Sequence, residues 1–439
     1  MPVTVRSVWY NMPELVLLLI FEQGARNTLH DDGLPFALRV SHVCRSWRII
    51  AAQSPSVWCS IPVHPRRPGL LEFFLERGRS ELSLDLCFHI KSSRTIAEET
   101  LVLGLSQPER VREVHLCAQH SFAVFLYISH LRRISLPRLA HFEINLAKTA
   151  YKGSLGPLPP ILNDGPPATL SSVALQGVSF PFQSIMLKEL TSLTLADLPR
   201  GLASPSYVSF RDLLLASPRL EYLKLDRVFP VLMREIDYGA IELSTLHTLE
   251  LVMEHDDTYI PDFFTILCVP NIRTLSFQSA WPVTCEGFEE ALRIIRATFE
   301  SLHTLRLALL TTHMPRDDGV QPILFDAFPE LRCFTLTAHS DRVVEHYLQP
   351  WIAATTEGSN IWPKLELLTV RAPFGDLESD EGGSLVDEAL ELLAGLRMSM
   401  SLPFEVWQEY VDPGAAESNH TGPPPSVQGA MSISGRSTG

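Results

Sequence analysis

From about residue 110 onward, the hydrophobic positions of the chain follow a short recurring pattern, Leu-x-x-Leu-x-Leu, in strict or looser form. Apolar and polar residues alternate at its end, which is typical of a strand with one buried face. The copies recur at intervals of about 20 to 34 residues, an even spacing that indicates a true repeat. We predict ten strands, within segments that begin at Val111, Leu139, Leu170, Leu190, Leu220, Leu246, Ile272, Leu302, Leu331 and Leu365.

Helical segments separate these strands, for example FRDLLLASP at 210–218 and CEGFEEALRIIRATFES at 285–301. In five units a proline stands two places before the first apolar residue, where it ends the preceding helix and favours an extended entry into the strand. The segment STLHTLEL is nearly copied in ESLHTLRL, which adds self-similarity. We therefore expect an α/β fold of parallel strands alternating with helices over residues 111–411. The five prolines are Pro137, Pro218, Pro270, Pro329 and Pro363.

The first 62 residues have a helical pattern instead. Pro13 and Glu14 suit a helix start, and the run to Phe21 is apolar on nearly every side, so we expect burial from more than one direction. A polar linker at 25–35 precedes one amphipathic helix predicted over 39–53. We divide the chain into a helical domain at 1–62, a linker and first repeat turn at 63–110, the repeats at 111–411 and a disordered tail at 412–439.

Composition narrows the class of protein. The net charge of −14 argues against a nucleic-acid binder, which needs a basic face. The seven cysteines are odd in number and form no Cys-x-x-Cys pair, which favours a reducing compartment. The most apolar early run, LVLLLIF, is too short to cross a bilayer, and no signal peptide is evident. We expect a cytoplasmic or nuclear protein with no membrane contact.

The strand–helix units resemble the leucine-rich-repeat family. The Asn or Cys that this family carries after its last leucine is absent here, so we expect an irregular solenoid. Leucines that face inward leave the alternate residues on a polar sheet face, and such faces commonly bind proteins. A merely solvated face is the alternative. The residues that we select as candidates for binding a protein substrate are Tyr222, Lys224, Asp226, Glu250, Gln278, Arg306 and Arg371.

The N-terminal segment, MPELVLLLIF followed by LRVSHVCRSWRIIAAQSPSVW, resembles the F-box. F-boxes paired with leucine-rich repeats are abundant in large fungal families. The resemblance implies docking on the Skp-type adaptor of a cullin-RING ubiquitin ligase, with the repeats holding a protein substrate. The alternative is a leucine-rich-repeat scaffold that uses these helices as a cap and has no ubiquitin role. The residues implied to bind the adaptor are Pro13, Leu17, Ile20, Phe21, Val43, Cys44, Trp47, Ile50 and Trp58.

Signatures of catalysis are absent from the sequence: it has no phosphate loop, no Rossmann glycine pattern, no Gly-x-Ser-x-Gly and no His-Glu-x-x-His. The best metal-like cluster is His115, Cys117 and His120, which lacks a fourth ligand. Cys44 is interpreted as a packing thiol and not as a nucleophile. We expect a non-catalytic protein without metal or cofactor, and the rival is an enzyme with an unfamiliar site across the polar sheet face.

Overall fold

The structure is a computed structural model of the whole chain, and it divides into two compact units, residues 1–204 and 205–439. Among the described residues, no helix is long and apolar enough to span a membrane. The described residues are 12–29, 34–64, 67–90, 98–147, 167, 169–178, 189–198, 205–232, 238–253, 259–279, 285–299, 301–309, 324, 327–338, 341–373, 385–399, 405–411 and 430–432.

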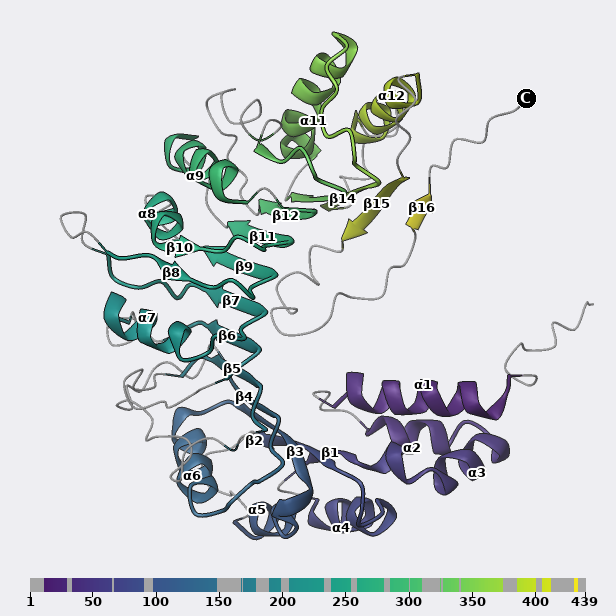
Figure 1. Cartoon of the computed structure of the whole chain (residues 1–439). Helices are drawn as coiled ribbons and strands as arrows, with labels where there is room; N and C mark the ends of the chain where they lie inside the picture. Colours follow the sequence, from purple (N-terminus) through teal and green to yellow (C-terminus); the bar gives the residue numbers. More distant parts are fainter. Residues whose placement is uncertain are drawn as a thin grey trace, which may run out of the picture. The chain divides into compact units, whose positions relative to one another are not determined.

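The first unit opens with a helical segment, α1 (Glu14–Asn27), α2 (Phe36–Ser41), α3 (Arg45–Gln53) and the 3-10 turn η2 (Pro55–Trp58) (Figure 1). Two expectations are corrected here. Helix α1 extends beyond Phe21, because Ala25 continues the buried stripe of Leu17 and Phe21 through one more turn. The single helix expected over 39–53 is two helices, separated by a short break that ends at Cys44.

The rest of the first unit is a parallel sheet with helices between its strands. Neighbouring strands pair in sequence order, β1 to β6. The strands are β1 (Ser60–Val63), β2 (Leu84–Ile90), β3 (Val111–Ala118), β4 (His141–Leu146), β5 (Ser172–Gln176) and β6 (Ser192–Ala196); the helices are α4 (Pro68–Arg77), α5 (Glu98–Gly104), η3 (Pro108–Arg110) and α6 (Ser121–Leu131).

The second unit repeats this plan, and α7, α8 and α9 lie along one side of its first strands (Figure 1). Its paired strands are β7 (Tyr222–Asp226), β9 (Thr248–Met253), β11 (Thr274–Ser279), β12 (Thr304–Leu309), β13 (Cys333–Ala338), β14 (Leu367–Pro373), β15 (Glu405–Val411) and the antiparallel β16 (Ala430–Ser432). Its helices are α7 (Tyr207–Leu215), α8 (Tyr259–Ile266), α9 (Cys285–Thr298), α11 (Asp341–Thr356) and α12 (Leu385–Ser399), and β8 (Ile241–Glu242) pairs with β10 (Leu267–Cys268).

All ten predicted strands are present, and the leucines face the core as expected. In β9, Leu249 and Leu251 are buried while Thr248 and Glu250 are half-buried. Leu249 lies in register with Leu275 of β11, so consecutive leucines stack into a continuous core. The architecture is thus the mixed α/β, parallel-strand arrangement expected of leucine-rich repeats.

Some strands were not predicted. Strand β2 is buried at every position and does not carry the repeat motif, and β1 is both short and fully buried. The array therefore begins within the segment at 60–90, before the first predicted strand. Strand β16 lies within the segment predicted as a disordered tail. The other residues of this segment, 412–429 and 433–439, lie outside the described residues.

Two threonine hydroxyls link consecutive units of the repeat. The Thr245 hydroxyl lies 2.9 Å from the carbonyl oxygens of both Pro218 and Leu220, one unit earlier. Thr169 makes the same pair of contacts to Pro137 and Leu139, at 3.1 and 2.8 Å. Each threonine hydroxyl thus donates its one proton to a carbonyl oxygen at the point where the preceding strand is entered.

Replacing Thr245 by valine is expected to lower the free energy of unfolding by about 1 kcal/mol, because it removes this hydroxyl but keeps the shape. Thr245→Ser, which retains the hydroxyl, is the control and should be closer to wild type. Denaturant unfolding of the full chain measures both. A Thr245→Val chain as stable as the Thr245→Ser chain would contradict the role given to the hydroxyl.

Candidate functional site

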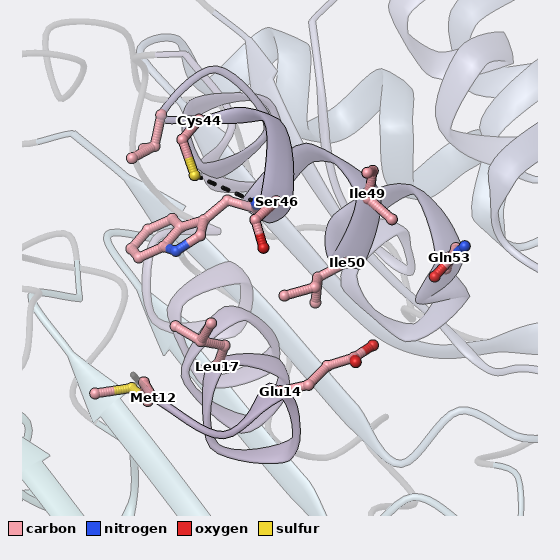
Figure 2. A pocket seen from close by; sticks show the side chains of 10 residues that line it. Met12, Glu14, Leu17, Cys44, Ser46, Ile49, Ile50 and Gln53 are labelled. Atoms are coloured by element: carbon pink, nitrogen blue, oxygen red, sulfur yellow. Dashed lines mark hydrogen bonds between the residues drawn. The ribbon is translucent and has the colours of Figure 1, made fainter. Parts of the chain in front are cut away.

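An open groove of about 590 Å³ lies between the start of α1 and α3. Figure 2 shows Leu17 and Glu14 of α1 facing Ile50 of α3 across it. The groove is apolar at its base and opens to solvent on one side. The residues that line it are Met12, Glu14, Leu17, Val43, Cys44, Ser46, Trp47, Ile49, Ile50 and Gln53.

Helix α1 is apolar on two opposite faces. Its inner face, Leu17, Phe21 and Ala25, is buried in the chain. Its outer face carries Leu15 and Leu19, which are 74% and 65% exposed, and also Val16 and Ile20. We call these four residues the α1 outer face. Among the described residues, burial from more than one direction, as expected for this helix, is therefore not found.

Close contacts fix the inner face of α1 against α2 and α3. The rings of Phe21 and Trp47 have centroids 5.0 Å apart and are tilted by 58°. Gly24 lets α2 approach, because a Cβ at this position would lie 2.3 Å from the ring of Phe36. The helices therefore hold α1 in one orientation, with its outer face directed away from the segment's own core.

Two apolar residues, one in the break between α2 and α3 and one on α3, are exposed. The Cys44 sulfur accepts a hydrogen bond from the Trp47 backbone N–H at 3.5 Å and so caps α3. Arg48 donates to the Ser41 carbonyl at 2.9 Å, which ties the start of α3 to the end of α2. Val43 in the break is 61% exposed and Ile49 on α3 is 46% exposed. Cys44 is half-buried and is a helix cap, which differs from its predicted place on a continuous helical stripe.

The other side of the helical segment packs on the repeats of its own unit. Trp58 is buried, and its indole N–H donates to the Ala51 carbonyl at 2.7 Å. The centroid of its ring lies 5.5 and 5.3 Å from those of Phe73 and Phe74 on α4. The Arg77 guanidinium lies 5.0 Å from the Trp58 ring centroid. The segment thus has one face fixed to α4, while Leu15 and Leu19 are exposed on α1.

The residues predicted to bind an adaptor differ in how exposed they are in the structure. Pro13, Ile20 and Val43 are exposed, and Cys44 and Trp47 are half-buried at the groove. Leu17, Phe21, Ile50 and Trp58 are buried. The residues selected from the sequence do not include Leu15, Val16 and Leu19 of α1 or Ile49 of α3. The apolar character of α1 on all sides is a signal that could have identified the first three.

The residues predicted to bind a substrate all lie in the second unit. Lys224, Glu250 and Arg306 fall in one row of register across the strands; Asp226, Gln278 and Arg371 fall in the next. The Lys224 Nζ and the Glu250 Oε2 atoms are 3.9 Å apart. Asp226 is 5% exposed and accepts from the Arg227 Nε at 2.8 Å, so its carboxylate is engaged within the chain. Tyr222 begins β7 and is half-buried.

A polar cluster on strands β3 and β4 of the first unit was not selected as a site from the sequence. His115 Nδ1 lies 2.8 Å from a Glu143 carboxylate oxygen, and its Nε2 lies 3.4 Å from Glu113. Burial alone would lower the pKa of His115, but the hydrogen bonds to Glu113 and Glu143 outweigh it and raise the pKa to about 9. His115 is therefore a cation at neutral pH, held between two carboxylates.

Comparison with known proteins does not identify a family for this chain. No family model and no curated protein matches the sequence. A solved structure described as "Crystal structure of Rad7 and Elc1 complex in yeast" aligns over 87% of this chain and 95% of that chain, at 13% identity and a TM-score of 0.38. A likeness this weak carries no argument. The chain's own strands and helices define its class, an α/β repeat protein with an N-terminal helical segment.

Proposed function

We propose that this chain is a substrate-recognition subunit of a Skp–cullin–F-box ubiquitin ligase. In this proposal α1 and α3 dock on the Skp-type adaptor, and the polar strand face of the repeats binds a protein substrate. The chain supplies binding and not catalysis: the substrate is held close to the ubiquitin-conjugating enzyme, so its effective concentration there rises. A cytoplasmic or nuclear location, without membrane or nucleic-acid contact, belongs to the same proposal.

The observation that carries the proposal is the exposed α1 outer face. Leu15 and Leu19 are mostly exposed on a helix whose opposite face is already buried against α2 and α3. Large apolar side chains that gather on one helical face are typical of a protein-binding surface. The F-box resemblance of this same segment names the kind of partner, a Skp-type adaptor.

The groove beside Val43 and Ile49 supports docking on a second side of the segment. Both side chains are largely exposed at its rim, and Leu17 and Ile50 form an apolar base. A concave site with an apolar base can accept an apolar anchor from a partner. We assign the groove to the same adaptor, which would bury both features at once.

Substrate binding is proposed for the strand face of the second unit. Its rows combine a charged pair, Lys224 and Glu250, with Arg306 and a series of threonines. This mixture suits the polar, hydrogen-bonding surface of a protein partner better than an apolar ligand.

The alternative, a repeat scaffold that uses the helical segment only as a cap, is favoured by one observation. Trp58 packs on Phe73 and Phe74, so the segment does cover α4 of the first unit. Capping accounts for the buried residues of the segment but not for the exposed Leu15 and Leu19. We therefore place it second.

A bridging experiment tests the proposal. The full-length chain should bind a purified cullin–RING complex only when a Skp-type adaptor is added, because the adaptor is the link between them. Size-exclusion chromatography of the mixtures measures this. Two results would contradict the proposal. The chain could remain separate from the cullin when the adaptor is present, or it could bind the cullin equally well without the adaptor.

A further inference from the structure

Three metal-binding side chains converge on neighbouring strands of the first unit. Cys87 and His89 lie on β2 and Cys117 lies on β3, where His89 and Cys117 are register partners. The Cys87 and Cys117 sulfurs are 3.8 Å apart, and one ligand atom from each of the three residues lies within 4.8 Å of the others. No backbone movement is needed to bring these donors around one ion.

The surroundings of the cluster suit metal ligands. Cys87 is fully buried and His89 is 5% exposed, while Cys117 is half-buried and leaves one side of the cluster accessible. His89 Nε2 lies 3.3 Å from the Leu29 carbonyl oxygen. A ring nitrogen that donates to a carbonyl leaves the lone pair of a neutral imidazole on the other nitrogen, and metal-binding histidines commonly have such a partner. His64 stacks on the His89 ring at a centroid distance of 4.8 Å and so limits its movement.

The neighbouring group of His115, His141 and Glu143 also brings three possible ligands together, but it contains no thiol. His115 is held between Glu113 and Glu143. Its two ring nitrogens face carboxylates, so it is engaged in ion pairs. His120, the third member of the group considered from the sequence, is exposed at the N-cap of α6. The strand β2, which was not predicted, supplies Cys87 and His89 instead.

We propose that Cys87, His89 and Cys117 form a transition-metal site, and that zinc is the ion they bind. Two thiolates and an imidazole are the donors that zinc prefers, and its tetrahedral geometry leaves one position for water or a fourth side chain. Binding releases the two thiol protons, so the thiolates balance the charge of the divalent ion. None of the three ligands is among the residues to which adaptor or substrate binding is assigned above.

Cobalt and zinc titrations of the full-length chain test the site. The chain is purified under reducing conditions, stripped with a chelator and titrated with Co²⁺. We expect one ion per chain, thiolate-to-cobalt charge-transfer absorption, and loss of that absorption when Zn²⁺ is added. Zinc should also raise the melting temperature of the wild-type chain, because it binds the folded state.

Two single variants and a matched control localise the ion. Cys117→Ala removes a half-buried ligand, and His89→Gln removes the imidazole without touching a thiol. Each should weaken zinc binding at least tenfold and abolish the zinc-dependent rise in melting temperature. Cys333→Ala, which removes a half-buried cysteine from β13 of the second unit, should change neither.

Three results would overturn the site. The first is a cobalt complex without thiolate charge-transfer bands, and the second is unchanged zinc affinity in both ligand variants. The third is a chain that binds no metal under reducing conditions and forms a Cys87–Cys117 disulfide on oxidation, which would make the pair a redox couple. Far-ultraviolet circular dichroism confirms that each variant is folded.

Discussion

A chain carrying Trp58→Ala is expected to lose about 3–5 kcal/mol of folding free energy, the range typical of removing a large buried aromatic side chain. The indole is 2% exposed and makes edge contacts with Phe73 and Phe74. Its loss also leaves the Ala51 carbonyl without the hydrogen bond that the indole N–H donates. Denaturant unfolding, followed by hydrogen exchange of α3 and α4, measures the change.

Trp58→Phe is the matched control for this substitution. It keeps an aromatic ring against α4 but removes the donor to Ala51, so its cost should be clearly smaller than that of Trp58→Ala. A Trp58→Ala chain that is as stable as wild type but no longer binds an adaptor would contradict the account. Such a result would mean that Trp58 contacts the partner directly, as the F-box resemblance implies, and does not act through the fold.

The second large effect is expected on the surface of α1. The double substitution Leu15→Gln and Leu19→Gln should weaken binding of a Skp-type adaptor at least a hundredfold. Each exposed leucine that becomes buried in an interface can contribute about 2 kcal/mol or more. The stability of the free chain should change little, because both side chains are mostly exposed and glutamine is a good helix former.

Val208→Gln with Leu215→Gln is the control for this prediction. These residues are 53% and 48% exposed on α7, in the second unit, so the same chemical change is made at a helix to which no adaptor role is given. The control chain should bind the adaptor as wild type does. Equal loss of binding in the two double variants would show that the effect is not specific to α1.

The repeats could be predicted from the sequence because their core is periodic. Leu249, Leu275 and Leu305 occur at the same place in successive units and are register partners in the sheet. Strand β2 was missed because its sequence, LDLCFHI, does not carry the Leu-x-x-Leu-x-Leu motif, although apolar residues alternate in it with Asp85, Cys87 and His89. The metal-binding side chains that it contributes were missed for the same reason.

The helical segment shows a different limit. The apolar stripe from Val40 to Ile50 predicts one helix, because periodicity alone cannot reveal that Cys44 caps a new helix after a short break. Nor can sequence alone separate the inner from the outer face of a helix that is apolar all around. Phe21 and Leu19 are equally apolar, yet Phe21 is buried against Trp47 and Leu19 is exposed.

Titration calorimetry of a purified Skp-type adaptor into the full-length chain tests adaptor docking. We expect saturable binding of one adaptor per chain with a negative heat-capacity change, because apolar surface on α1 and in the groove becomes buried. We also expect that the Leu15→Gln and Leu19→Gln chain gives no comparable binding heat. A folded wild-type chain that gives no binding heat at any temperature would contradict adaptor docking.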